Sequence, residues 1–417
     1  MKSRILHLGL GAFHRAHQAV YHQALLDAGE PGWALWSGNL RADPTGAEAA
    51  LLAQAGAYTL ETISAAGLHR YQRIGSIARV IAHERGLRRL VEAAAEPATR
   101  IISCTVTEAG YAVAAPDPQA ETLYAFLCRA LRERMRVDAG PVALLCCDNL
   151  RHNGQVLRHG LLQFAQALDD APLQAWIGAN CSFPCTMVDR ITPRPHAAVR
   201  ERVRVATGRI DDAALMAEDW LQWVVEDRFI AGRPAWERVG VQMVASAAEV
   251  TAFEEAKIRI LNASHSALAW AGTLRGHRFI HECARDPAIR QIAHDYVSDD
   301  VIPLLRARGL QERIDLPAYR DAVLARFGNE ALADTVERVS ADSAAKLREF
   351  ILPTLRERLQ RGEPVASTAR LPALFHRCGS DITLTAFCSD AALFGELAGD
   401  ARLLHAMQQA VEHIAAL

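Results

Sequence analysis

The sequence lacks the marks of a membrane protein, of a secreted protein and of a general nucleic-acid binder. Its first apolar run, Ile5–Leu10, is far shorter than the roughly 18 residues of a membrane span, and it leads into a glycine turn. Neither charge is in excess, because 46 Lys and Arg stand against 48 Asp and Glu. We therefore expect a cytoplasmic protein with no membrane and no nucleic-acid partner.

Paired cysteines are lacking as well. The nine cysteines are an odd number, and several stand in apolar, strand-like runs, which is typical of reduced and buried thiols. Cys181 and Cys185 are the only pair with the spacing of metal ligands, and no second pair completes a tetrahedral site. We expect no metal site.

The length and the apolar content are sufficient for two domains. Of the 417 residues, 50% are hydrophobic. We predict an α/β fold, with a Rossmann-type dinucleotide-binding domain over residues 1–247 and a mostly α-helical substrate and catalytic domain over residues 248–417. The predicted strands are Arg4–Gly9, Trp33–Gly38, Tyr58–Ile63, Tyr71–Val80, Arg100–Thr107, Val142–Cys147, Trp220–Asp227 and Val239–Ala245, and the last two are expected to extend the sheet. The predicted helix ends in the second domain are Gly272, Pro287, Pro303, Pro353 and Pro372.

The turn after the first strand is a candidate nucleotide site. Gly9 and Gly11 permit a tight turn and a close approach of the backbone to a pyrophosphate at the start of the next helix, which is predicted to run to about Leu26. His14 replaces the third glycine of the full motif, so the spacing also fits a turn that binds no nucleotide. Asp43, beyond the second strand, can accept both ribose hydroxyls and repel a 2′-phosphate, which favours NAD over NADP. A solvated loop aspartate is one alternative there, and Arg41 beside it could instead bind the 2′-phosphate of NADP.

One helix-like stretch carries the candidate catalytic residues. Thr251 and Glu254 have the spacing of a capping box, which predicts where the helix begins. At about 100° per residue, Lys257, Asn262 and His265 then fall on the face that should be buried.

These buried polar side chains have a chemical use. Burying an amine and an imidazole costs several kcal/mol unless they are paired or functional. A lysine in a dry cleft can act as a base near neutral pH, because burial disfavours its charged form. An amide beside it can donate a hydrogen bond to a developing oxyanion. The plain alternative is an amphipathic helix whose Lys257 and His265 border its polar side, and spacing alone leaves both open.

The spacing Lys-x4-Asn-x2-His in this stretch resembles the signature of the polyol-specific long-chain dehydrogenases. That family includes mannitol 2-dehydrogenase, arabinitol dehydrogenase and the fructuronate and tagaturonate reductases. Other segments are similar to family motifs in the same order, namely Gly9-Leu-Gly-Ala-Phe-His-Arg, Thr105-Val-Thr-Glu-Ala-Gly-Tyr, Cys147-Asp-Asn-Leu-Arg-His-Asn-Gly and Phe183-Pro-Cys-Thr-Met-Val-Asp-Arg-Ile-Thr-Pro. The resemblance implies that Lys257 is the general base, that Asn262 and Asn153 form the oxyanion hole, and that no metal takes part. It further implies that Glu108 passes the proton to water.

The resemblance also implies binding residues. Those placed near the cofactor are Phe13, His14 and Arg15. Asp189 is expected to support the cleft or touch substrate. Arg338 and Lys346 lie in a stretch similar to the family's Arg-x3-Asp-x3-Lys pattern and would contact substrate hydroxyls, although spacing alone favours two solvated helix charges. Ala341 and Ser343 depart from the family pattern, which leaves the substrate open.

The expected function is therefore a metal-independent, NAD(H)-linked dehydrogenase that interconverts a sugar alcohol and its ketose. Lys257 would take the hydroxyl proton while His265 orients the oxygen. No Tyr-x3-Lys occurs in the chain, which disfavours the short-chain dehydrogenases. The alternatives are a hexuronate reductase of the same family and a catalytically silent NAD-binding sensor. The expected partner is a small polyol or ketose, and the chain is expected to be a monomer or small homo-oligomer.

Overall fold

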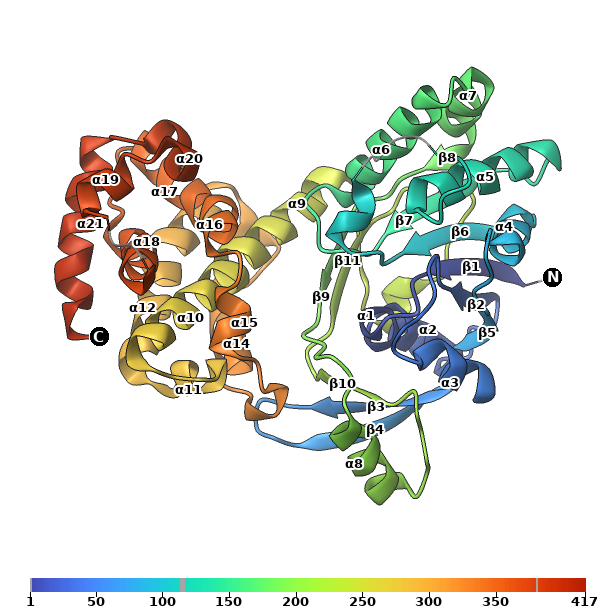
Figure 1. The fold of residues 1–417 in the computed structure, drawn as a ribbon, viewed down its shortest axis with the longest axis horizontal. Coiled ribbons are helices and arrows are strands. Elements are labelled where there is room, and N and C mark those ends of the chain that lie inside the picture. Colours follow the sequence, from blue (N-terminus) through green and yellow to red (C-terminus); the bar gives the residue numbers. More distant parts are fainter. Residues whose placement is uncertain (1, 113–116, 380–381) are drawn as a thin grey trace. The chain divides into compact units, whose positions relative to one another are not determined.

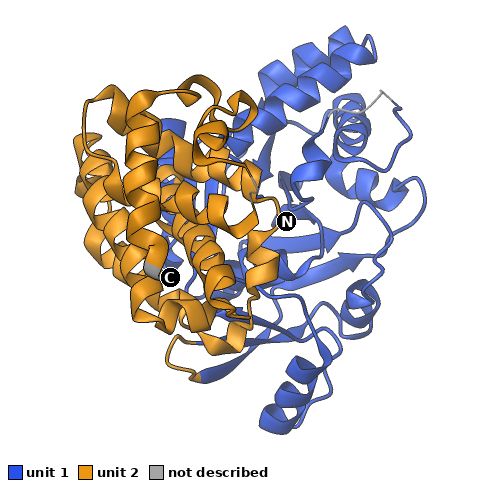
Figure 2. Cartoon of the chain, turned by 60° about the vertical axis from the view of Figure 1, so that its left-hand side comes forward, with its two compact units in different colours: residues 1–63, 69–253 blue, residues 64–68, 254–417 orange. Residues whose placement is uncertain are grey.

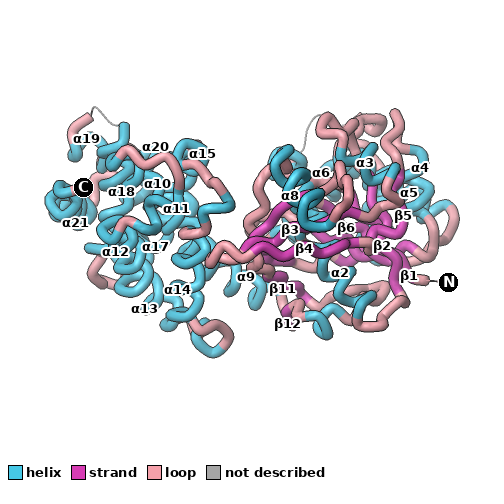
Figure 3. The backbone as a smooth tube through the Cα atoms, turned by 90° about the horizontal axis from the view of Figure 1, so that it is seen from below, coloured by secondary structure: helices cyan, strands magenta, loops and turns pink. Residues whose placement is uncertain are grey.

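The structure is a computed structural model that describes residues 2–112, 117–379 and 382–417. Its contacts divide the chain into unit 1, residues 1–63 and 69–253, and unit 2, residues 64–68 and 254–417, which Figure 2 colours separately. The expected α/β class is confirmed, since the twelve strands of the described ranges lie in unit 1 and unit 2 is built of helices (Figure 3). The functional boundary expected after residue 247 stays a prediction.

Unit 1 is organised around a six-stranded parallel sheet of order β5-β2-β1-β6-β7-β8 (Figure 1). Its strands are β1 (Ser3–Leu8), β2 (Trp33–Gly38), β5 (Ile77–Ile81), β6 (Thr99–Cys104), β7 (Val142–Cys146) and β8 (Cys181–Ser182). The order of the strands in the chain reverses between the neighbouring strands β1 and β6, which is the switch point of the sheet. Sheets of this kind bind ligands at the carboxyl ends of the strands around that switch point.

Both faces of this sheet are buried. Successive side chains of a strand point to opposite faces and so join different clusters. Leu6 and Leu8 of β1 belong to an apolar cluster with the helices of one face, whereas Ile5 belongs to a cluster with the helices and small sheets of the other. The helices of the first face are α4 (Arg88–Ala95), α5 (Leu123–Arg136), α6 (Asn153–Ala167) and α7 (Ala171–Asn180). The other helices of unit 1 are α1 (Ala12–Ala16), α2 (Gln18–Asp27), α3 (Ala47–Ala53) and α8 (Ala197–Thr207), with short 3₁₀ turns η1 (Glu108–Tyr111) and η2 (Trp236–Val239).

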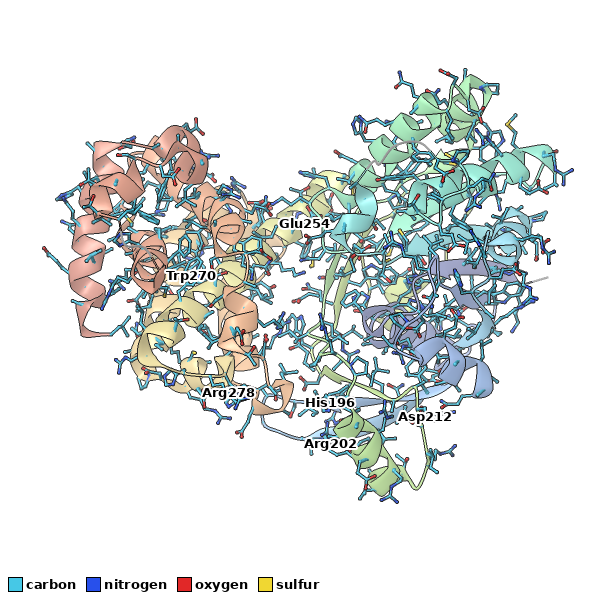
Figure 4. All side chains as sticks on the ribbon, in the orientation of Figure 1. His196, Arg202, Asp212, Glu254, Trp270 and Arg278 are labelled. Atoms are coloured by element: carbon cyan, nitrogen blue, oxygen red, sulfur yellow. The ribbon has the colours of Figure 1, made fainter. Side chains whose placement is uncertain are left out.

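Two small sheets complete unit 1, with orders β10-β3-β4 and β12-β11-β9. Their strands are β3 (Tyr58–Ile63), β4 (His69–Ile74), β9 (Thr186–Asp189), β10 (Leu215–Glu218), β11 (Gln222–Glu226) and β12 (Gln242–Val244). Arg202 of α8 lies beside the β3–β4 hairpin and donates two hydrogen bonds to the buried Glu61 at 2.6 and 2.8 Å (Figure 4). This ion pair between the partly exposed Arg202 and the buried Glu61 connects α8 to the hairpin.

Two strand predictions for unit 1 are wrong. The single strand predicted at Tyr71–Val80 is two strands, β4 and β5, which join different sheets. The chain turns between them where the Ser76 hydroxyl donates to the Ala19 carbonyl of α2 at 2.6 Å. The two strands predicted after residues 220 and 239 are β11 and β12, and they form a separate sheet with β9 instead of extending the main one.

Unit 2 is arranged around α10 (Ala263–Arg275), which contacts α11, α12, α15 and α18. Trp270 of α10 lies inside this unit, and its indole donates to Ser343 Oγ at 2.7 Å (Figure 4). The α-helices around it are α11 (Ile280–Arg285), α12 (Pro287–Asp295), α13 (Ile302–Ala307), α14 (Leu316–Phe327), α15 (Val336–Ser340), α16 (Ser343–Lys346), α17 (Leu352–Gln360), α18 (Ala366–Gly379), α19 (Leu384–Cys388), α20 (Ala391–Phe394) and α21 (Ala401–His413). Between them lie π-helical segments η3 (Lys257–Asn262), η4 (Tyr296–Val301) and η7 (Leu347–Ile351), and 3₁₀ turns η5 (Leu310–Glu312), η6 (Glu330–Leu332), η8 (Gly395–Leu397) and η9 (Ile414–Ala416).

The predicted start of the catalytic helix is wrong. Helix α9 (Ala247–Ala256) begins four residues before Thr251, where Ser246 Oγ accepts a hydrogen bond from Glu249 N at 3.4 Å. Thr251 is inside the helix, and its hydroxyl donates to the Ala247 carbonyl at 3.0 Å. A capping hydroxyl is available at Ser246, so the Thr251 and Glu254 pair is not the cap.

Of the predicted helix ends, the one at Pro287 is confirmed, because α11 ends at Arg285, and the other four are wrong. Helix α10 continues through Gly272 and ends at Gly276, which has φ +73°. A Cβ at Gly272 would stand 2.3 Å from Cys283 Sγ, so this glycine serves close packing against α11. The prolines at 287, 303 and 353 lie in the first turns of helices, where a missing N–H costs little, and Pro372 lies inside α18.

Candidate active site

The stretch around Lys257 is not a regular α-helix. Residues Lys257–Asn262 form the π-helical segment η3, in which hydrogen bonds join residues five apart. Lys257 and Asn262 are its two ends, and His265 follows in the first turn of α10. Lys257 is buried, with 7% of its surface exposed. Such π-helical insertions are frequent at functional sites.

A pocket of about 170 Å³ lies in unit 2 beside this segment. Asn262 and His265 line it from the start of α10, and Arg338 and Lys346 line it from α15 and α16. The chain breaks between these two short helices at Asp342, which has φ +56°. The break, not helical periodicity, therefore brings the two cations to one pocket.

Asp334 connects His265 and Arg338 at this pocket. Its Oδ2 lies 3.3 Å from His265 Nε2, and Arg338 donates Nε and Nη2 to the two carboxylate oxygens at 2.6 and 2.5 Å. Burial acts against ionisation, but the hydrogen bonds from His265 and Arg338 outweigh it and lower the pKa of Asp334 to about 2. Burial lowers the pKa of His265, on which the Phe327 ring stacks with centroids 4.7 Å apart. Motif analysis missed Asp334 and Phe327 because their roles depend on spatial partners.

Lys346 is fixed at the same pocket, where its Nζ donates to the Val339 carbonyl at 2.7 Å. Burial and then the charge of Arg338 lower the pKa of Lys346, while Asp342 and Asp334 act in the opposite direction. The sequence holds only three lysines, Lys2, Lys257 and Lys346, among its 46 Lys and Arg. Two of the three stand at the candidate site, a compositional signal that the motif comparison did not use.

In unit 1 the turn after β1 lies at the carboxyl edge of the sheet, next to the switch point. Gly9 has φ +112°, and a Cβ there would stand 2.3 Å from the Thr105 carbonyl oxygen. Around Gly11 a Cβ would meet nothing within 4 Å. The fold itself requires Gly9, whereas Gly11 leaves open space of the kind that admits a pyrophosphate to the backbone. The turn fits a dinucleotide.

The side chains after this turn point into unit 1. The single helix predicted to Leu26 is split at His17 into α1 and α2. His14 stacks on His7 with ring centroids 3.5 Å apart, and burial holds the pKa of His14 well below its ordinary value. Arg15 is buried and donates to a backbone carbonyl at 2.6 Å, and Phe13 is partly exposed. Cofactor contacts of these three residues stay predictions.

Asp43 lies in the loop between β2 and α3. Its carboxylate accepts hydrogen bonds from Thr45 N and Oγ1 at 2.9 and 2.6 Å and from Glu48 N at 2.8 Å. Burial acts against ionisation, but these bonds outweigh it and lower the pKa of Asp43. A charged carboxylate therefore stands just beyond the second strand, and its contact with a ribose stays a prediction.

The loop after β6 is held in an uncommon conformation. Thr107 has φ +67°, which is costly for a β-branched residue. Asp148, just after β7, accepts hydrogen bonds from Val106 N and Thr107 N at 2.8 and 3.2 Å and from Tyr111 Oη at 2.6 Å. Glu108 follows Thr107 and is exposed. Asp148 had no predicted role, although its place directly after a buried strand was a usable signal.

Asn153 is the first residue of α6 and is completely buried. Its Nδ2 lies 2.9 and 3.0 Å from Thr186 O and Oγ1 and 3.3 Å from Cys146 O, and its Oδ1 accepts from Thr186 N at 2.9 Å. The side-chain amide of Asn153 therefore connects the end of β7 and the start of α6 with the start of β9. Its role in an oxyanion hole stays a prediction.

Asp189 is the last residue of strand β9 and Arg190 follows it, and both are buried. Arg190 donates to the carbonyl of Ala16 at 2.5 Å and to that of Glu218 at 2.8 and 2.9 Å, and burial lowers its pKa to about 10. This pair lies where a supporting role is expected, and contact of Asp189 with substrate stays a prediction.

Three further properties concern only the described residues. No group of three or more His, Cys, Asp or Glu side chains is placed there to hold a metal ion. The nine cysteines are all free thiols. No helix in these ranges has the length and apolarity to cross a lipid bilayer.

Both units of the chain are similar to domains of known proteins. Residues 3–238 match the mannitol dehydrogenase Rossmann domain, and residues 249–381 match the mannitol dehydrogenase C-terminal domain. The chain is 47% identical to D-arabinitol 4-dehydrogenase of Ralstonia nicotianae, over 97% of this chain and 95% of that protein. It is 43% identical to D-arabinitol 4-dehydrogenase of Klebsiella pneumoniae, over 97% of both.

A solved structure is similar throughout. The ternary complex of Pseudomonas fluorescens mannitol 2-dehydrogenase with NAD and D-mannitol has a TM-score of 0.83 and 33% identity, and covers 100% of this chain and 92% of that one. Two relatives at 35% identity are the polyol:NADP oxidoreductase of Gluconobacter oxydans, over 86% of this chain and 76% of that protein, and the D-mannonate oxidoreductase of Escherichia coli, over 87% and 77%. With both domain models matched and relatives this similar over nearly the full length, the chain belongs to the mannitol dehydrogenase family.

Proposed function

We propose that this chain is a metal-independent, NAD-linked dehydrogenase that interconverts a sugar alcohol and its ketose. The observation that carries the proposal is the pocket of unit 2, where Asn262 and His265, next to the segment opened by Lys257, share one cavity with Arg338 and Lys346. The names of the relatives make D-arabinitol and D-mannitol the first substrates to test.

Lys257 is the proposed general base. Its neutral amine takes the proton of the substrate hydroxyl, so that the C–O bond becomes a carbonyl as the hydride leaves the same carbon. The nicotinamide, when bound, accepts that hydride. Asn262 donates a hydrogen bond to the oxygen as negative charge develops, and neutral His265 adds another. Each such donor is commonly worth about 3 kcal/mol in the transition state. Glu108 is proposed to pass the proton on to water.

Asn153 is the proposed second donor of the oxyanion hole. Its amide hydrogens already face the carbonyl oxygens of Thr186 and Cys146, so donation to a substrate requires Asn153 to share one of them. Its removal is therefore expected to reduce stability as well as activity. Asp189 is proposed to hold the end of β9 and to touch substrate from there.

The proposed cofactor is NAD. The open space at Gly11 would take the pyrophosphate, and Phe13, His14 and Arg15 would support that turn. The charged Asp43 would accept ribose hydroxyls and repel a 2′-phosphate. One relative is named for NADP, so both cofactors belong in the test.

The test is turnover by the purified protein, followed through the absorbance of NADH or NADPH. The panel is D-arabinitol, D-mannitol, sorbitol, xylitol, D-mannonate and D-altronate, each with NAD and with NADP. We expect oxidation of an uncharged polyol, with kcat/KM for NAD about tenfold or more above that for NADP. A zinc chelator should leave the rate unchanged, and a loss of activity with it contradicts metal independence. No turnover on the whole panel by protein that still binds NADH contradicts the proposal and supports the silent sensor.

A further inference from the structure

The carboxylate of Asp334 contacts both Arg338 and His265 beside the unit 2 pocket, and backbone hydrogen bonds fix the position of this residue. Asp334 accepts the N–H of Ile280 on its own carbonyl at 2.9 Å, and the next residue, Thr335, forms an isolated antiparallel bridge with Phe279. Thr335 Oγ1 also accepts from Arg338 N at 3.2 Å and so caps α15. Asp334 and Arg338 therefore lie four residues apart where the backbone enters α15.

The pairing of Asp334 with Arg338 uses the arginine in a specific way. Nε and Nη2 of Arg338 each donate to one carboxylate oxygen, which is the two-pronged geometry that guanidinium groups prefer. Nη1 and the second hydrogen of Nη2 are left to donate to substrate hydroxyls. Arg338 thus offers directional donors while its charge is offset by its partner.

The remaining charges at the pocket are offset too. Lys346, the other cation, donates to the Val339 carbonyl and lies within the electrostatic reach of Asp342 and Asp334. His265, whose ring faces Asp334, has its charged form disfavoured by burial. Arg338 and Lys346 are the charged residues of the pocket lining, and the carboxylates of Asp334 and Asp342 offset these two cations from outside the lining.

We propose that Asp334 is a positioning and specificity-determining residue, which orients Arg338 and His265 and makes the pocket select uncharged polyols over hexonates. This inference rests on the proposed function and narrows its substrate class. A carboxylate that entered the pocket would meet a guanidinium whose charge Asp334 already offsets, so it would gain little attraction in return for the free-energy penalty of leaving water. An uncharged polyol meets the same donors without that penalty. The hexuronate reductase alternative is thereby disfavoured for this chain.

The main experiment compares the wild type with Asp334→Asn, which keeps the shape and removes the charge. The readout is the ratio of kcat/KM for D-mannonate to kcat/KM for D-arabinitol, with the cofactor saturating. We expect this ratio to rise about tenfold or more in Asp334→Asn and to stay at the wild-type value in Asp334→Glu. The matched control is Asp227→Asn, since Asp227 binds Arg233 with the same two-pronged geometry in unit 1. An equal fall on both substrates in Asp334→Asn overturns the inference.

A second measurement needs no variant. The wild type oxidises D-arabinitol in the presence of either D-mannonate or its uncharged amide, and the inhibition constants are compared. We expect the amide to inhibit at about tenfold lower concentration, and equal inhibition overturns the inference. Failure of the proposed function is a separate result, namely a wild type that oxidises neither the polyols nor the hexonates.

Discussion

Lys257 and Asn262 are the first and last residues of one π-helical segment. On an α-helix their side chains would be separated by about 140°, whereas hydrogen bonding between residues five apart reduces this angle. The segment is anchored by Arg259, whose Nε lies 2.7 Å from Glu255 Oε2 and whose Nη2 lies 3.2 Å from Glu357 Oε2. The position of Lys257 therefore depends on a buried ion network two residues further along the chain.

Arg259→Met is expected to destabilise unit 2. The substitution removes one partner from the buried Glu255 and from the partly buried Glu357, and loss of one partner of a buried ion pair typically costs about 3–5 kcal/mol. Urea unfolding measures the free energy. The control is Arg204→Met, because Arg204 pairs with Glu201 on the surface and should change nothing measurable. Equal stability of the two variants would contradict the anchoring role.

Gly9→Ala and Gly11→Ala are expected to fail in different ways. At Gly9 a methyl group would collide with the Thr105 carbonyl and the backbone has a positive φ, so the melting temperature should fall with or without cofactor. At Gly11 the methyl group meets no protein atom, so the fold should be kept while the Kd for NADH rises about tenfold or more. Calorimetry and fluorescence titration give the two quantities. A Gly11→Ala chain that binds NADH like the wild type would show that no pyrophosphate approaches this turn.

Asn153→Ala is expected to lower both stability and turnover. Removal of the buried amide leaves Thr186 N and several carbonyls without this partner, at a cost of about 1–3 kcal/mol. Activity measured well below the melting temperature separates the two effects, and a further loss of about 10²-fold in kcat is expected from the missing oxyanion donor. The control Asn180→Ala removes one partly exposed hydrogen bond and should leave kcat unchanged. Full kcat in folded Asn153→Ala would remove Asn153 from the oxyanion hole.

The stability that Asp334 contributes should depend on pH. Its folded pKa of about 2 lies below the ordinary value near 3.9, so the contribution is fully present above about pH 4 and is lost as the pH falls through 2. The expected difference between the wild type and Asp334→Asn is about 2 kcal/mol near neutral pH, and it should shrink steadily below pH 4. Denaturant titrations across this range measure it. A difference that stays constant would mean that the charge of Asp334 does not stabilise the fold.

The parts of the fold that local pattern determines were predictable from the sequence. The strand before Gly9, the turn itself and the buried strand before Asp148 lie as expected, because apolar runs bounded by glycine or polar residues are strong signals. The split at Ser76 was not predictable, since its cause is a hydrogen bond to Ala19 on another element. The helix start at Ser246 was missed because a second capping pattern at Thr251 competed with it.

The candidate site shows the same division. The motif identified Asn262, His265, Arg338 and Lys346, and these four line one pocket. The helical wheel gave the wrong geometry for Lys257, because a π-helical segment has no simple signature in residue spacing. Asp334 could not be assigned from spacing at all. Its importance comes from a backbone bridge to Phe279 and from two partners on different helices.

The measurement that tests the account most directly is chemical rescue of Lys257→Ala. The variant is assayed for oxidation of D-arabinitol by NAD with and without added ethylamine, and Lys346→Ala is the matched control. If Lys257 is the base, its loss should reduce kcat about 10³-fold, NADH binding should persist, and turnover should rise with the concentration of free amine, whereas Lys346→Ala should show a raised KM and no rescue. Turnover that survives Lys257→Ala at the wild-type rate would contradict the mechanism.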